Sequence, residues 1–205
     1  MIVPREKNKP HREETQIPYV GLRGWKIENG KLLSLSKRYV WSAENPIVAE
    51  HDEGIGFEMA NFKLAQTLHR EFVNCSCGLY AFHEMESLLE NMKLEIAAAS
   101  TRAATCVCIG ASLHWGEVVI TQKGLRSTRA QPLALLSPED WVNGYKQTLS
   151  KDHFLVMRAR QIVDPSGPMM VNARGISEDY HLPLLREEGF YAYLEEFGQR
   201  EKLID

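Results

Sequence analysis

The sequence contains none of the short motifs that identify the most common catalytic and nucleotide-binding folds. A phosphate-binding G-x-x-x-x-G-K-[S/T] loop, a G-x-G-x-x-G turn after a strand, an H-E-x-x-H helix and a G-x-S-x-G elbow are all absent. Internal repeats and low-complexity tracts are absent as well. The sequence therefore gives no sign of a nucleotide-binding enzyme, a zinc protease or a serine hydrolase of the usual kinds.

Long apolar runs are also missing, and none reaches the length of a membrane-spanning helix. The first three residues are followed at once by Pro4 and Arg5, which leaves no apolar core for a secretory signal. We therefore expect a cytoplasmic protein without a membrane partner. Cysteine is scarce, at four of 205 residues, and in the cytoplasm these thiols are expected to be free or metal-bound rather than paired as disulfides.

The net charge is only −3 at pH 7, but it is unevenly distributed. Residues 1–40 and 101–136 are net basic, whereas residues 41–100 and 137–205 are net acidic. The small net charge argues against a protein that coats nucleic acid, so nucleic acid is not a favoured partner. The two basic segments form one positive surface if they meet in space; otherwise each neutralises the acidic segment beside it.

Apolar residues make up 44% of the sequence, and their spacing predicts an α+β fold with a mostly antiparallel sheet. Asn29-Gly30 lies between two apolar runs and is typical of a tight hairpin turn, because both residues tolerate positive φ. Pro132 indicates a position at the edge of the sheet or beyond it. Strands are expected over 21–27, 32–36, 39–41, 79–82 and 128–136, and two more within 104–120.

Three regions are predicted along the chain. Residues 1–18 are polar, basic and punctuated by proline, which is typical of a flexible arm, so order is expected to begin near Tyr19. Residues 19–136 form the α+β core domain, in which two helices over 57–73 and 83–98 pack on the sheet. Residues 137–205 form a mainly helical C-terminal subdomain.

Within this C-terminal subdomain the pattern changes several times. Ser137 and Pro138 are typical of a helix start, and residues 154–163 alternate like a strand. Ser177 is expected to cap a short helix that Pro183 interrupts. A final amphipathic helix is expected near the end of the chain, with Phe190, Tyr191, Leu194 and Phe197 on one side.

Arginines and hydroxyl groups cluster after the glycine turn at 124, where Arg126 and Arg129 flank Ser127 and Thr128. Guanidinium groups and hydroxyls bind phosphate and carboxylate well. If the first hairpin lies beside this segment, its cations join the cluster and the tryptophans offer a stacking surface. The candidate ligand-binding residues are Arg23, Lys26, Arg126, Arg129, Trp25 and Trp115. The alternative is that these arginines simply pair with the acidic segment.

All four cysteines lie in two C-x-C pairs, Cys75/Cys77 and Cys106/Cys108. Two close thiol pairs on separate elements can supply the tetrahedral ligand set that zinc prefers, so zinc is the one candidate cofactor. In a strand, however, the two side chains of a C-x-C pair lie about 6.6 Å apart along one face. Cysteine also packs well as a small buried residue, and core packing is the competing interpretation.

A small cytosolic enzyme is the alternative to a binding protein. Cys77 with His83 resembles the start of a thiol nucleophile and its base, and His114 with Glu117 contains an acid–base pair. Catalytic sets of this kind are normally assembled from distant segments, so closeness in sequence supports neither pair. A strand would moreover place His114 and Glu117 on opposite faces.

Several segments together resemble a family of uncharacterised phage and bacterial proteins. In that family a C-x-C-G-[I/L]-Y-A segment precedes a W-G-x-V-V strand, a glycine turn and an arginine-bearing A-x-P segment. The matching segments are CSCGLYA at 75–81, WGEVV at 115–119, GLRS at 124–127 and AQP at 130–132. The resemblance covers about residues 20–136 and implies a phage or mobile-element setting. The family has no counterpart of Cys106/Cys108, which counts against a four-cysteine metal site.

Taken together, these patterns favour a non-enzymatic binding protein. Its partner is expected to be a small anionic ligand or, in a phage setting, a host protein, met by the basic and aromatic residues named above. A zinc-stapled interaction module is the third hypothesis, and it predicts that chelators unfold the protein.

Overall fold

In the computed structural model the described residues are 11–35, 39–49, 78–99, 106–141 and 168–200. The helix predicted over 57–73 and the strand predicted over 154–163 lie outside these ranges, as do Cys75 and Cys77. Within the described ranges, no helix combines the length and the apolar character needed to cross a membrane.

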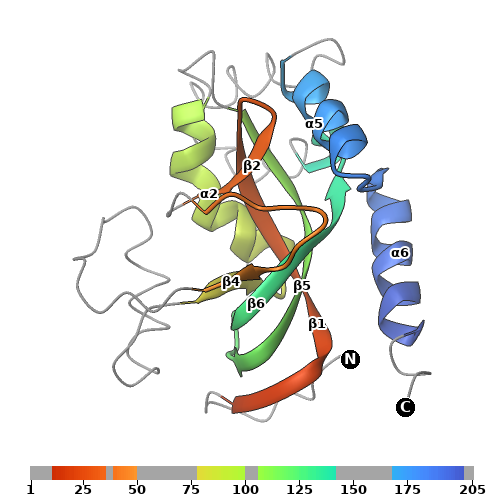
Figure 1. Ribbon diagram of the computed structural model, residues 1–205. Coiled ribbons are helices and arrows are strands. Elements are labelled where there is room, and N and C mark those ends of the chain that lie inside the picture. The colour runs from red at the N-terminus through yellow and green to blue at the C-terminus, as the bar shows by residue number, and fades with distance from the viewer. Residues whose placement is uncertain (1–10, 36–38, 50–77, 100–105, 142–167, 201–205) are drawn as a thin grey trace.

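The fold is a mixed one, with a large sheet and several helices, as the apolar spacing predicts (Figure 1). Every strand pair is antiparallel except β6 with β7. The elements in chain order are β1 (His11–Glu28), β2 (Lys31–Ser34), β3 (Ile47–Val48), β4 (Leu79–Phe82), α2 (Met85–Ala99), β5 (Cys106–Ile120), β6 (Gly124–Leu136), α5 (Pro168–Asp179), β7 (Leu184–Leu185) and α6 (Glu187–Arg200).

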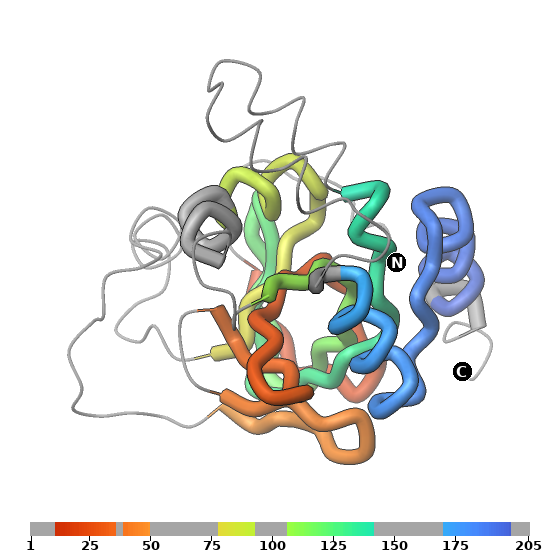
Figure 2. Tube along the Cα trace, turned by 90° about the horizontal axis from the view of Figure 1, so that it is seen from above, coloured from red at the N-terminus to blue at the C-terminus, as the bar shows by residue number. Residues whose placement is uncertain are grey.

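Three long strands, β1, β5 and β6, form the centre of the sheet and curl around one another (Figures 1 and 2). β1 pairs with β5, β5 pairs with β6, and β6 pairs with the short strand β4. β4 meets β1 through one residue pair, Leu22 with Phe82, so the pairing runs in a closed circuit. One face of these strands therefore points into a small barrel and the other points outward.

Helices cover the outside of this circuit, with α2 on one side and α5 and α6 on the other (Figure 1). Gly24 lets α2 approach β1 closely, because a Cβ at that position would lie 2.2 Å from Sδ of Met92. Ile176 on α5 and Phe190 on α6 belong to the same core cluster as Trp25 on β1. Residues on both sides of the boundary predicted at 137 therefore share one core.

The hairpin at Asn29-Gly30 is confirmed, with φ of 51° and 71°, and so are β4, α2 and α6. Other expectations were wrong. Order begins by His11 rather than near Tyr19, because residues 11–15 pair with β5. The span 106–120 is one strand with irregular register rather than two strands, because a local bulge replaces the predicted break.

Two further findings concern Pro132, where the prediction holds in part, and Ser177, where it is wrong. Pro132 lies inside β6 and pairs with Ser112 of β5 at a register shift. On the other side of β6 the described partners pair only with residues 124–127, 129–130 and 135–136, so β6 is not an edge strand as a whole but has no described partner there at Pro132. Ser177 lies within α5 rather than before a helix, and its hydroxyl donates to the carbonyl of Leu182 in the turn that follows. Both residues lie next to irregular backbone, which a local sequence pattern does not reveal.

Candidate functional site

The sheet places Trp115 directly opposite Arg129, and Val48 of β3 directly opposite Arg129 on the other side. The three residues form a row across β5, β6 and β3, which we call the Trp115 face. Arg129 is exposed, Val48 is 57% exposed and Trp115 is partly buried. Two of the predicted ligand-binding residues, Trp115 and Arg129, are therefore neighbours on one surface.

A pocket of about 590 Å³ lies beside this row, where the strands are irregular. β1 shifts register between Thr15 and Tyr19, and β5 shifts register between Trp115 and Val118. Gly116 has a φ of 79°, and a Cβ there would lie 2.5 Å from Oγ1 of Thr128, so the bulge requires glycine. The pocket is lined by Arg12, Glu13, Glu14, Gln16, Gly116, Glu117, Thr128 and Arg129.

The cations of the pocket differ in their partners. Arg12 forms an ion pair with Glu117, with 2.5 Å between Nη2 and Oε1. The guanidinium of Arg129, in contrast, makes no hydrogen bond or ion pair with any residue in the described ranges. Because it is exposed and forms no ion pair with the carboxylates that line the pocket beside it, Arg129 is available to an external anion.

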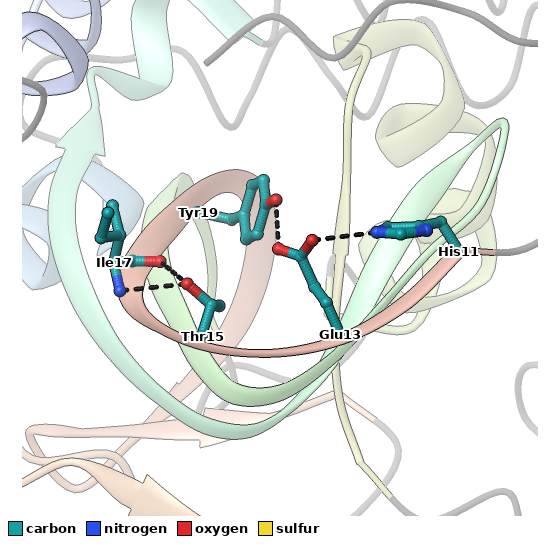
Figure 3. A network of polar contacts seen from close by, with 5 residues as sticks. All are labelled: His11, Glu13, Thr15, Ile17 and Tyr19. Carbon is teal, nitrogen blue, oxygen red and sulfur yellow. Dashed lines mark hydrogen bonds and ion pairs between the residues drawn. The ribbon is translucent and has the colours of Figure 1, made fainter.

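A polar network holds the wall of the pocket that β1 provides (Figure 3). The Tyr19 hydroxyl donates to one oxygen of Glu13, and Nε2 of His11 lies 2.9 Å from the other. The Tyr19 hydroxyl, followed by His11, holds the pKa of Glu13 below its usual value. Burial and the Glu13 carboxylate raise the pKa of Tyr19 to about 12. Thr15 and Ile17 exchange a hydrogen-bond pair within the irregular segment.

Arg23, predicted for the same surface, lies elsewhere, at the junction of β1, β2 and β4. Its Nη1 donates to the carbonyl of Tyr80 and its Nη2 donates to Oγ of Ser34, at 3.1 Å for the second contact. The guanidinium carbon lies 4.5 Å from the ring centroid of Trp41, a cation–π contact. Burial lowers the pKa of Arg23 to about 9, which leaves it charged at neutral pH.

A fully buried histidine lies inside the barrel between two serines. Nε2 of His114 lies 2.7 Å from Oγ of Ser112, and Nδ1 lies 2.8 Å from Oγ of Ser127. Ser127 donates its own proton to the carbonyl of Arg129, so it accepts from Nδ1–H, and Ser112 donates to Nε2. Burial, followed by the charge of Arg23, keeps the pKa of His114 well below its ordinary value. The imidazole is therefore neutral with the proton on Nδ1.

This arrangement resembles a nucleophile and its base, but Ser112 and His114 have no exposed surface. The acid–base pair predicted from the sequence is not formed, because His114 hydrogen-bonds the two serines rather than Glu117, which pairs with Arg12 on the surface. His83, the predicted partner of Cys77, is exposed, and its Nε2 lies 3.0 Å from the carbonyl of Thr121.

The remaining predicted residues are distributed over the fold. Trp25 is fully buried against Trp41, with ring centroids 5.6 Å apart, so it offers no surface for stacking. Lys26 donates to the carbonyl of Leu35, at 3.0 Å, beside the hairpin. Arg126 lies opposite Tyr80, and its aliphatic stem packs over Gly78. The structure thus brings Trp115 and Arg129 together and leaves the other four apart from them.

Cys106 and Cys108 are both free and buried. Nδ2 of Asn172 lies 3.1 Å from Sγ of Cys106, and burial raises the pKa of both thiols. Both side chains point to the same face of β5, as core residues do. No group of three or more His, Cys, Asp or Glu residues in the described ranges could hold a metal ion.

Sequence reasoning missed Arg12 and Gln16, because they lie in a segment that reads as a flexible arm. It also missed the Ser112–His114–Ser127 set, for which the spacing gives no signal.

No family model, no curated protein and no solved structure matches this chain.

Proposed function

We propose that this protein is a non-enzymatic, cytoplasmic binding protein and that an anionic ligand binds where the Trp115 face meets the pocket. The observation that carries the proposal is the exposed guanidinium of Arg129, which has no partner among the described residues and lies beside Trp115. A guanidinium binds phosphate or carboxylate through a fork of N–H donors, and an indole ring next to it provides apolar contact area.

The dimensions and charges of the pocket support a ligand that is more than a simple inorganic anion. Its volume of about 590 Å³ lies in the range of small-molecule sites. Glu14 and Glu117 line it together with Arg129, so a ligand with hydrogen-bond donors next to its anionic group fits best. A host protein with an acidic segment is the alternative partner, and the phage setting implied by the sequence favours it. We also propose that residues 137–205, which include α5 and α6, form a mainly helical subdomain.

Native mass spectrometry of the protein purified from its expression host, without added ligand, tests this function. We expect the wild type to carry a small-molecule mass excess, which Arg129→Ala loses. Lys31→Ala serves as the matched control, because Lys31 is an exposed cation on β2. If instead a host protein copurifies with the wild type and not with Arg129→Ala, the partner is a protein rather than a small ligand. Equal binding by the wild type and Arg129→Ala would contradict the proposal.

A further inference from the structure

A second group of polar side chains lies at the junction of β1, β2 and β4, away from the Trp115 face. β4 joins β1 through the pair Leu22 and Phe82, and Arg23 follows directly after that pair. Its guanidinium bridges the junction, because it contacts the Tyr80 carbonyl on β4 and the Ser34 hydroxyl on β2. We call the group formed by Arg23, Trp25, Ser34 and Trp41 the junction cluster.

The junction cluster holds its members in fixed positions. Trp25 and Ser34 are direct partners in the β1–β2 ladder, so their side chains point to the same face. Trp41 packs edge to face against Trp25 and lies over the guanidinium of Arg23. Nε1 of Trp41 donates to Oγ of Ser34 at 2.9 Å, which is the same oxygen that Arg23 uses. The donors of the cluster are thus preorganised.

Three donors in this cluster remain unused among the described residues. Nε of Arg23 and Nε1 of Trp25 are buried and have no hydrogen-bond partner. Ser34 already accepts two hydrogen bonds, so its hydroxyl has only its proton left to offer, and it donates that proton to no residue of the described ranges. Buried donors without partners are rare in native proteins, and each requires an acceptor such as water or an ion.

The cluster also carries a positive charge, that of Arg23, which no acidic residue of the described ranges pairs with. This charge extends into the barrel, where it helps to keep His114 neutral. Arg23 as a whole retains some exposed surface, which gives a small ion a way to approach it. A cation grouped with unused N–H and O–H donors is complementary to an oxyanion and to no cation.

We propose that the junction cluster is a binding site for a small oxyanion, in which Arg23 supplies the charge and the free donors of Arg23, Trp25 and Ser34 supply the hydrogen bonds. The anion is a tetrahedral phosphate or sulfate, or a carboxylate group. This site is independent of the Trp115 face, and either can exist without the other.

Thermal unfolding in increasing millimolar concentrations of inorganic phosphate, sulfate or acetate tests the site, with chloride at the same ionic strength as the reference. A ligand that binds only the folded state raises the Tm in a saturable way. We expect such a rise in the wild type, with the anion that gives the largest rise naming the ligand. Trp25→Phe removes one unused donor together with part of a fully buried ring, and it should weaken the apparent affinity at least about tenfold, the usual effect of one hydrogen bond to a charged group.

Two controls make the outcome specific. Trp141 is a second buried tryptophan whose Nε1 has no partner, but it lies outside the cluster, so Trp141→Phe should bind the anion like the wild type. Arg129→Ala should also retain the rise, which separates this site from the Trp115 face. Arg23→Lys keeps the charge but removes the fork, and it should lose the rise. No saturable rise in the wild type, or equal affinity in the wild type and Trp25→Phe, would overturn the proposal even if Arg23→Lys fails to fold.

Discussion

Trp115 on β5 and Arg129 on β6 are directly opposite each other in the sheet, and they lie at the point where β5 departs from regular pairing. The irregularity turns the next residues of β5 toward the pocket, so that Gly116 and Glu117 line it together with Arg129. The bulge is therefore the feature that joins an aromatic side chain, a cation without a partner among the described residues and a concave surface in one place.

The first prediction concerns the bulge itself. Gly116→Ala should destabilise the protein by about 2 kcal/mol, because a residue with a side chain is strained at positive φ and the new Cβ would meet Thr128. Gly30→Ala is the matched control, since Gly30 also has positive φ but a Cβ added there would meet no atom within 4 Å. Urea unfolding of both variants should show the larger loss at Gly116. Equal losses would show that Thr128 makes no contribution.

The second prediction is a pH dependence that originates at His114. Its pKa is lowered in the folded protein, whereas a histidine in the unfolded chain titrates near 6.5. Below about pH 6.5 the unfolded chain therefore binds an additional proton, and stability falls as the pH decreases, by up to about 1.4 kcal/mol per unit. Urea unfolding between pH 7 and pH 5 should show this slope in the wild type and a shallower one in His114→Gln. Parallel slopes would contradict the buried neutral histidine.

The third prediction concerns the hydrogen bond between Tyr19 and Glu13. Tyr19→Phe should cost about 1 kcal/mol, since the bond involves a charged group but is only partly buried. The pKa of Tyr19 is raised, so this contribution is complete below about pH 10 and is lost as the pH rises toward 12. A spectrophotometric titration of the wild type should therefore contain a late phenol near pH 12 that Tyr19→Phe lacks. An unchanged titration would refute the assignment.

The fourth prediction separates the two cysteine pairs. Cys106 and Cys108 are buried and their thiol pKa values are raised, so iodoacetamide at neutral pH should label them slowly. Peptide mass spectrometry measures the rate at each of the four cysteines. Zinc bound to all four would also protect Cys75 and Cys77, and a chelator would then release every thiol and unfold the protein. Fast labelling of Cys75 and Cys77 without a chelator would exclude the four-cysteine site.

Local patterns predicted much of the secondary structure, because they depend on neighbouring residues. The Asn29-Gly30 turn follows from two residues that tolerate positive φ, and helix α2 follows from the periodicity of its apolar side chains. The closed strand circuit was not predictable, because it depends on the single pair Leu22 and Phe82, which are 60 positions apart in the sequence. His11 to Thr15 looked like part of a disordered arm, since only pairing with β5 gives those polar residues an extended structure.

The candidate site was predictable only in part, for a related reason. The types of residue that form the site were predicted, but the face of the sheet on which each side chain lies was not. Strand alternation puts Arg23 and Trp25 on the barrel face, whereas the bulge turns Arg129 outward. A bulge reverses the alternation that sequence reasoning relies on. The prediction therefore placed six residues on one surface, whereas the structure forms an outer pair, puts Arg23 and Trp25 in a separate inner cluster and leaves Lys26 and Arg126 outside both.

The most direct test of the central claim uses the fluorescence of Trp115. The other three tryptophans, Trp25, Trp41 and Trp141, are buried, and the part of the quenching that Trp115→Phe removes reports on Trp115 rather than on an anion bound beside Trp25 and Trp41. Titration with citrate and with a nucleoside monophosphate should give saturable quenching in the wild type and in Lys31→Ala. It should be absent in Trp115→Phe and at least tenfold weaker in Arg129→Ala. Failure of both anions to quench the wild type, or undiminished quenching in Arg129→Ala, would contradict the account.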